Sequence, residues 1–157
     1  MSRTAPPPAT SRCFKTGIGV YQHYNGKFGK QVYIIHPGEY LASADPIMIS
    51  TVLGSCVGVA LYDSRLRVGG LNHFMLPGSL DSRSFMTSET GKYGMFAMEL
   101  LINDLIKMGA HKERLRAKVF GGGHVLQNEV DEKGGVPQSN ISFAFEYLKT
   151  ESIPVET

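Results

Sequence analysis

The sequence predicts a single domain that combines strands and helices, of the α/β or α+β class. The chain has 157 residues, and a domain usually takes about 100–200. Short β-branched and aromatic runs end at Gly or Pro, as strands do. Two later segments place apolar residues at the helical spacing of three and four. Strands and helices mixed along one chain are typical of these two classes.

The composition argues against several classes of function and location. Sixteen basic and fourteen acidic residues leave a net charge of +2, which is too small to favour binding to nucleic-acid phosphates. The hydrophobic fraction of 42% and the charged fraction of 19% indicate a globular domain. The longest uncharged run, residues 46–62, contains Gly, Ser and Thr and is too short to span a bilayer. No secretion signal is recognisable, so we expect Cys13 and Cys56 to be reduced and the protein to be cytoplasmic.

The chain divides into an extension and a domain. Residues 1–30 are expected to form a flexible N-terminal extension, since consecutive prolines among polar residues bury too little apolar surface to fold. Residues 31–157 are expected to form the domain. Its expected elements are strands over 32–36 and 47–53, a hairpin with strands over 56–61 and 68–76, a loop over 79–91, a helix over 92–108 stopped by Gly109, a strand over 112–120 with one basic face, a polar loop through residue 137, and a helix over 142–149.

The hairpin contains the most informative pair of residues. If its loop is centred between Ser64 and Arg65, Cys56 lies directly opposite His73. Opposite residues on one face of a sheet have Cβ atoms about 4.5–5.5 Å apart. A slip of one residue would place the two side chains on opposite faces. The expected register therefore puts a thiol beside an imidazole.

A neighbouring thiol and imidazole are able to perform acyl transfer. A free thiol has a pKa of about 8.5, and an imidazole that accepts its proton makes it a stronger nucleophile at neutral pH. His73 would then return the proton to the leaving amine. Backbone N–H groups near Gly54, Ser55 and Cys56 are candidates for binding the oxyanion. The alternative is that Cys56 is a small core residue and His73 a hydrogen-bonded strand residue.

Thr51 and two glycines are further candidates. Thr51 lies on the strand before Cys56, where its hydroxyl is able to orient His73 as the third member of a triad orients the base. A strand threonine is more often a β-branched filler. Gly121 and Gly122 are candidates for a backbone that passes close to the substrate, and a plain turn is the alternative.

Other patterns are weaker. Residues 54–58 match the G-x-nucleophile-x-G elbow, which requires a helix after the nucleophile, whereas the residues that follow favour a strand. The five histidines have no close metal-ligand spacing, and no phosphate-binding loop motif is present, so no metal or cofactor is expected. The basic face of the strand over 112–120 is either a solvated edge or a docking surface for an acidic partner.

Several blocks of the sequence are specific in their order and spacing. They are HPGEY (36–40), STVLGSCV (50–57), GGLNHFMLP (69–77), KY (92–93), AMELLIN (97–103) and AKVFGG (117–122). Over about residues 32–155 the chain resembles the CheD family of chemoreceptor glutamine deamidases. The LGSC and NHFMLP segments are the most specific part of this resemblance.

The resemblance implies a fold, a reaction and roles for three residues. The implied fold is an α/β sandwich of mixed sheets flanked by helices. The implied reaction converts selected glutamines of methyl-accepting chemotaxis receptors to glutamates and releases ammonia. In that reaction Cys56 is the nucleophile, His73 the general base and acid, and Thr51 the residue that orients His73.

The resemblance also implies partners, and it implies that the chain is shorter at its C-terminus than family members. The receptors are the implied substrates, and a CheC-type phosphatase is an implied partner in some chemotaxis systems. Family chains continue beyond the position that matches residues 153–155, so a truncated C-terminus is expected. The alternative function is a non-catalytic module that docks to receptor or phosphatase. Retention of Thr51, Cys56 and His73 favours the enzyme, and the missing C-terminal segment favours the non-catalytic module.

Overall fold

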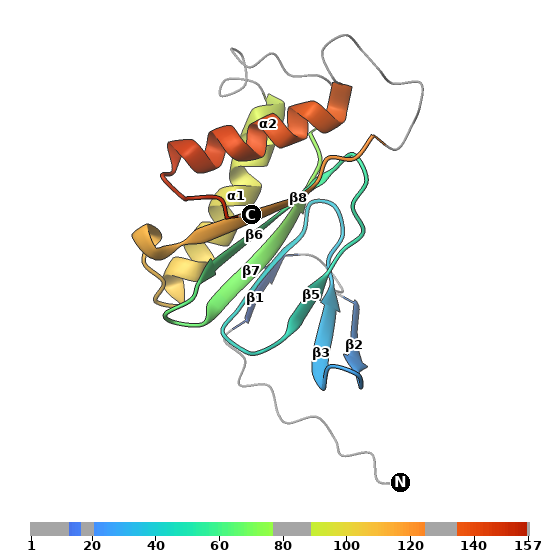
Figure 1. Cartoon of the computed structure of the whole chain (residues 1–157), viewed down its shortest axis with the longest axis vertical. Coiled ribbons are helices and arrows are strands. Elements are labelled where there is room, and N and C mark those ends of the chain that lie inside the picture. The colour runs from blue at the N-terminus through green and yellow to red at the C-terminus, as the bar shows by residue number, and fades with distance from the viewer. Residues whose placement is uncertain (1–12, 17–20, 77–88, 125–134, 157) are drawn as a thin grey trace, which may run out of the picture.

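The computed structural model describes residues 13–16, 21–76, 89–124 and 135–156. It has an α+β fold with two sheets and two helices, which confirms the expected class (Figure 1). The five-stranded sheet is antiparallel throughout and has the order β1 (Cys13–Thr16), β4 (Tyr40–Ser43), β7 (Val68–Phe74), β6 (Val57–Asp63) and β8 (Arg116–Gly121). The three-stranded sheet has the order β2 (Tyr21–Asn25), β3 (Lys30–Ile34) and β5 (Met48–Ser50), with β3 and β5 parallel.

The five-stranded sheet is covered differently on its two faces. Helices α1 (Glu89–Lys107) and α2 (Gly135–Thr150) both lie over one face, and the three-stranded sheet lies on the other side (Figure 1). The helix-facing core holds alternate residues of β6 together with apolar residues of both helices. Between the sheets, Leu41 and Leu71 pack with Ile35 and Ile49 in a smaller cluster. The central strands therefore have apolar residues on both faces, as buried sheets do.

The helices and the last strand differ from the expected bounds. The first helix begins three residues earlier than expected and still ends before Gly109, whose φ of +98° suits a helix stop. The expected strand over 112–120 begins only at Arg116, because residues Lys112–Arg114 form a 3₁₀ turn. The second helix begins at Gly135, well before residue 142. Pro137 lies in its first turn, where proline is tolerated because the first N–H groups have no intrahelical partner.

The expected N-terminal extension contributes two strands. Strand β1 pairs with β4, and β2 pairs with β3. These strands are stabilised by backbone hydrogen bonds to neighbouring strands. The amino-acid composition of residues 1–30 does not reveal such pairing. The first 12 residues of the extension, most of the expected loop over 79–91 and the loop over 125–134 lie outside the described residues. The domain boundary at residue 31 stays a prediction. No helix in the described part of the chain is long and apolar enough to cross a membrane.

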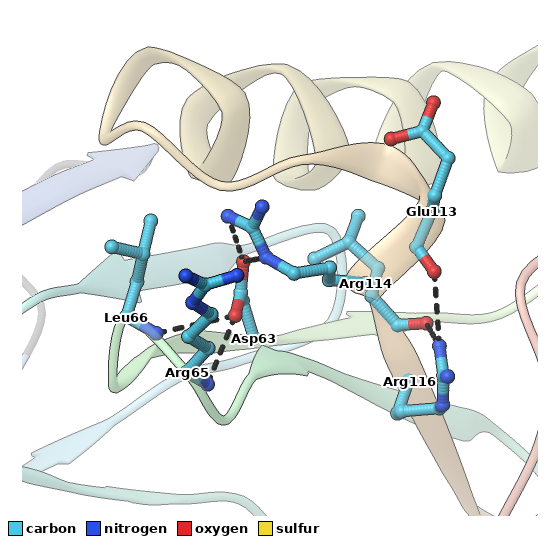
Figure 2. A network of polar contacts seen from close by, with 7 residues as sticks. Asp63, Arg65, Leu66, Glu113, Arg114 and Arg116 are labelled. Atoms are coloured by element: carbon cyan, nitrogen blue, oxygen red, sulfur yellow. Dashed lines mark hydrogen bonds and ion pairs between the residues drawn. The ribbon is translucent and has the colours of Figure 1, made fainter.

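The loop between β6 and β7 sets the register of the hairpin. Asp63 is fully buried and accepts hydrogen bonds from the backbone N–H groups of Arg65, at 3.0 Å, and Leu66, at 3.2 Å. The Nε of Arg114 donates to the same carboxylate at 2.9 Å, and Figure 2 shows the carboxylate between the loop and this arginine. Arg67 adopts a φ of +59° and closes the turn by donating its N–H to the Asp63 carbonyl at 2.9 Å. Asp63 consequently pairs with Val68 and not with Leu66.

Candidate active site

The side chains of Cys56 and His73 are in hydrogen-bond contact. The Nε2 atom of His73 lies 2.9 Å from the Sγ atom of Cys56. Cys56 is 9% exposed and His73 2% exposed. The register differs from the expected one by two residues, because the strand partner of His73 is Gly58. Since side chains alternate with a period of two, this difference leaves Cys56 on the expected face of the sheet, and Gly58 has no side chain to separate the pair.

Thr51 holds the other nitrogen of the imidazole. It directly follows β5, and its Oγ1 atom lies 2.8 Å from Nδ1 of His73. The same hydroxyl donates its only hydrogen to the carbonyl of Ile35 at 2.8 Å. Oγ1 is then left as an acceptor, which assigns the imidazole proton to Nδ1. The unprotonated Nε2 consequently faces the sulfur of Cys56, as a general base requires.

The surroundings of His73 favour its neutral form. Burial lowers the pKa of His73 most, and the nearby charge of His36 lowers it further. A hydrogen bond with the Ile35 backbone and the charge of Glu39 act in the opposite direction, and the net shift of the pKa is downward. The backbone of His73 is hydrogen-bonded to the segment that precedes β4. The His73 N–H donates to the Glu39 carbonyl at 2.9 Å, and the Gly38 N–H donates to the His73 carbonyl at 2.7 Å. The lowered pKa favours the neutral form of the ring at neutral pH, and the backbone hydrogen bonds fix the position of His73.

Residues 54–56 form the nucleophile loop, which carries Cys56, the expected nucleophile, and hydrogen bonds to its carbonyl groups hold it in place. The Gly54 carbonyl accepts a hydrogen bond from the Gly123 N–H at 2.8 Å, and the Cys56 carbonyl accepts one from the Gly122 N–H at 2.9 Å. Between them, the Ser55 carbonyl accepts one from the side-chain amide of Asn140 at 3.2 Å. Three successive carbonyls are thus bound by donors from the end of β8 and from α2.

The glycines after β8 allow this close approach. Gly121 has a φ of +97°, and a Cβ atom there would lie 2.2 Å from the Cys56 carbonyl oxygen. Gly122 has a φ of +68°, and its Cβ atom would lie 2.4 Å from Cγ1 of Ile141. Any side chain at either position would displace the nucleophile loop or the helix. The structure therefore brings Gly121 and Gly122 to the backbone of Cys56.

The expected oxyanion residues also lie at the nucleophile. The Gly54 N–H points at the Sγ atom of Cys56, at 3.5 Å. The carbonyl of Ser55 faces α2 through Asn140. Contact with a substrate oxyanion at Gly54, Ser55 or Cys56 stays a prediction. A cleft of about 580 Å³ opens between the two sheets, with Thr51 and Leu53 on its wall.

The structure bears on two alternatives that the sequence left open, the nucleophile elbow at residues 54–58 and the role of the basic face of residues 112–120. The residues after Cys56 form strand β6 rather than a helix, which excludes the nucleophile elbow. On the basic face, Arg114 pairs with buried Asp63, Lys112 pairs with Glu151 at 2.5 Å, and Arg116 lies 3.7 Å from Glu156. Three of its charges therefore have acidic partners inside the chain. Among the described residues, no three His, Cys, Asp or Glu side chains are grouped closely enough to hold a metal ion.

Asn140 contacts the candidate site but was not among the residues expected there from the sequence. This residue is fully buried in α2. A signal was present, because Asn140 precedes Phe143, Ala144 and Tyr147 at helical spacing and these three residues are also buried. A polar residue on an apolar helix face indicates a buried hydrogen-bonding role. The expected helix began at residue 142 and therefore excluded this position.

Comparisons with known proteins identify the family of the chain. Residues 75–157 match the family described as CheD chemotactic sensory transduction. The chain is 47% identical over 134 residues to the probable chemoreceptor glutamine deamidase CheD 1 of Shewanella oneidensis, in an alignment covering 85% of this chain and 64% of that protein. It is 46% identical over 136 residues to the probable chemoreceptor glutamine deamidase CheD 2 of Burkholderia thailandensis, covering 87% of this chain and 68% of that protein. The chain thus spans about two thirds of the length of these relatives.

A solved structure gives a weaker match. The match with the crystal structure of the hypothetical protein YfiH from Bacillus licheniformis covers 75% of this chain and 50% of that protein, with 16% identity and a TM-score of 0.46. The family of the chain is shown by the match of residues 75–157 to the family and by the identity of 46–47% to the two relatives over most of this chain. On this evidence the chain belongs to the CheD family.

Proposed function

We propose that the chain is a protein-glutamine deamidase that converts selected glutamine side chains of methyl-accepting chemotaxis receptors to glutamates and releases ammonia. The names of its relatives support the substrate and the reaction. The single observation that carries the chemistry is the distance of 2.9 Å between Sγ of Cys56 and Nε2 of His73. A hydrolysis of this kind needs a nucleophile beside a base, and the base in turn oriented by a third group.

The first half of the reaction forms a thioester. Nε2 of His73 accepts the proton of the Cys56 thiol, and the thiolate attacks the carbonyl carbon of the glutamine side chain. A carbon–sulfur bond forms and the carbonyl oxygen becomes an oxyanion. The imidazolium then gives its proton to the amide nitrogen, the carbon–nitrogen bond breaks, and ammonia leaves.

The second half releases the glutamate. His73 accepts a proton from a water molecule that attacks the thioester carbon, and the carbon–sulfur bond breaks to restore the thiol. Thr51 accepts the hydrogen bond of Nδ1–H throughout. It keeps the ring in the tautomer that presents Nε2 to the sulfur, and it stabilises the imidazolium that forms twice in each cycle.

The test is ammonia release from a purified cytoplasmic fragment of a chemotaxis receptor. Wild type is expected to release ammonia, and Cys56→Ala to release none while its circular dichroism and melting temperature stay unchanged. Cys13→Ala is the matched control, because it removes the other cysteine and should retain full activity. Mass spectrometry of the fragment identifies the converted glutamines. Equal ammonia release by wild type and Cys56→Ala would refute the enzyme and leave the non-catalytic docking module.

The partners and location follow as part of the same proposal. The receptor is the proposed substrate, and a CheC-type phosphatase is a proposed binding partner on the strength of the family resemblance alone. The proposed mechanism requires a reduced Cys56, which supports a cytoplasmic location as part of the proposal. Co-purification of the chain with a CheC-type phosphatase at equimolar ratio tests the second partner.

A further inference from the structure

The Asn140 side chain joins two segments of the candidate site. Its Nδ2 donates to the Ser55 carbonyl at 3.2 Å and to the Val136 carbonyl at 3.0 Å. Its Oδ1 accepts the Leu76 N–H at 2.8 Å. The side chain is fully buried, so both amide hydrogens and the oxygen are satisfied inside the protein. One carboxamide thereby connects the nucleophile loop to the segment that follows His73.

The hydrogen bond from Asn140 to the Ser55 carbonyl also orients the backbone N–H of Cys56. The Ser55 carbonyl and the Cys56 N–H belong to one peptide unit, and the described chain has no cis peptide bond. In a trans peptide the carbonyl and the N–H point in opposite directions. Because Asn140 holds the carbonyl toward α2, the Cys56 N–H points away from α2. Among the residues that the structure describes, none accepts a hydrogen bond from this N–H.

The free N–H lies where a negative charge would develop. The oxyanion of an acyl-transfer reaction forms on the carbon atom bonded to Sγ of Cys56, within reach of the N–H of the same residue. Backbone N–H groups of this kind stabilise tetrahedral intermediates when they are fixed in advance, and the loss of one donor slows a reaction by about 10²–10³-fold. Neighbouring carbonyls of Gly54 and Cys56 are held by backbone N–H groups. The Ser55 carbonyl is instead held by the side chain of Asn140. A substitution of Asn140 therefore removes the hydrogen bond that fixes the peptide between Ser55 and Cys56.

We propose that Asn140 is a positioning residue that presents the Cys56 N–H to the oxyanion. The proposal rests on the acyl-transfer chemistry proposed for Cys56 and His73, and it does not depend on which protein supplies the glutamine. Asn140 touches no reacting atom, and it acts only through the peptide between Ser55 and Cys56.

Two reactions of Cys56 separate this role from a general role in folding. In acylation by p-nitrophenyl acetate, the thiolate attacks the acetyl carbon, an oxyanion forms, and p-nitrophenolate leaves as the thioester is made. In alkylation by iodoacetamide, the thiolate displaces iodide from a methylene carbon and no oxyanion forms. Both rates depend on the same thiolate. Only acylation depends on the oxyanion donor.

The variant is Asn140→Asp, which has the same shape, keeps an acceptor for the Leu76 N–H and removes the amide donors. Asn140→Ala is the second variant. Asp104→Asn is the matched control, because it alters a buried hydrogen bond between α1 and Tyr40 that does not involve the nucleophile loop. All are made in the Cys13→Ala background, so that Cys56 is the only thiol, and thermal unfolding is recorded for each.

We expect Asn140→Asp to slow acylation about tenfold or more and to change the alkylation rate by less than about threefold. The control Asp104→Asn should change neither rate. Equal losses in both reactions, or no loss in acylation, would overturn the proposal. Failure of both Asn140 variants to fold would also overturn it, because the residue would then be needed for the fold itself. Ammonia release by wild type tests the proposed deamidase separately. A wild type that is acylated but releases no ammonia would remove the receptor substrate and leave this inference standing.

Discussion

The imidazole of His73 contacts the sulfur of Cys56 at 2.9 Å, although its partner in the strand register is Gly58. Cys56 lies one residue before β6 begins, and diagonal neighbours on one face of a sheet are within reach of long side chains. The contact therefore requires the two residues to share a face, and it does not require them to be directly opposite.

The pH dependence of the reaction should report the lowered pKa of His73. Only the neutral ring accepts the thiol proton, so kcat/KM should fall as the pH falls through this pKa, with a midpoint below the usual value of about 6.5. His36→Gln removes a charge that lowers the pKa of His73 and should move the midpoint to higher pH. The measurement is kcat/KM for ammonia release between pH 4.5 and 8, a range set by about two units on either side of the histidine pKa. A downward shift in His36→Gln would contradict the prediction.

Thr51→Val should reduce kcat about tenfold or more while leaving a folded protein. Valine has nearly the shape of threonine and cannot accept the hydrogen bond from Nδ1–H, so the ring loses the group that selects its tautomer. The Ile35 carbonyl also loses its hydroxyl donor, which should lower the stability by about 1–3 kcal/mol. Thr51→Ser restores the hydroxyl and should restore most of kcat. If Thr51→Ser is as slow as Thr51→Val, the hydroxyl is not the operative group.

Gly121→Ala should destabilise the protein and slow every reaction of Cys56. The new Cβ would lie 2.2 Å from the Cys56 carbonyl oxygen at a φ of +97°, and a residue forced into such backbone costs about 1–3 kcal/mol. Gly123→Ala is the matched control, because the nearest atom to its Cβ is 3.6 Å away and its N–H is retained. Urea unfolding and the alkylation rate of Cys56 measure the two effects. Similar losses in both variants would argue against the close approach at Gly121.

Asp63→Asn should destabilise the hairpin loop and change how stability depends on pH. Burial alone would raise the pKa of Asp63, but hydrogen bonds from Arg114 and from the N–H groups of Leu66 and His111, with the charge of Arg114, lower it overall. A lowered pKa in the folded state stabilises the protein above the pKa of the unfolded chain, and this stability is lost as the pH falls through the folded-state pKa. At pH 7 the variant should lose about 3 kcal/mol, because it leaves Arg114 without its buried partner.

The difference between wild type and Asp63→Asn should shrink as the pH is lowered below about 4. Urea unfolding at a series of pH values measures it. Glu156→Gln is the control, since its pairing with Arg116 is at the surface and such pairs contribute less than about 1 kcal/mol. A difference that is constant between pH 7 and pH 3 would show that the Asp63 charge is not responsible.

Local pattern was sufficient for most of the fold. The spacing of Met98, Leu101 and Leu105 predicted the first helix, and all three are fully buried against the sheet. The alternation along β6 and β7 predicted the central hairpin. These features are encoded within a few residues of each other, since a helix or strand must turn its apolar side toward the core. Strands β1, β2 and β4 were missed, because their pairing depends on strands distant in the sequence and not on their own composition.

The site divides in the same way. The sequence by itself pointed to Cys56, His73 and Thr51 as the candidate site residues, and it determined that Cys56 and His73 share a face of the hairpin. Only the tertiary structure decided the register, because Asp63 is held by Arg114 from another part of the chain. It also decided the contacts of Thr51 with His73 and of Asn140 with Ser55, which join residues 22 and 85 positions apart. Hydrogen bonds over such separations depend on how sheets and helices pack, and no local pattern specifies that packing.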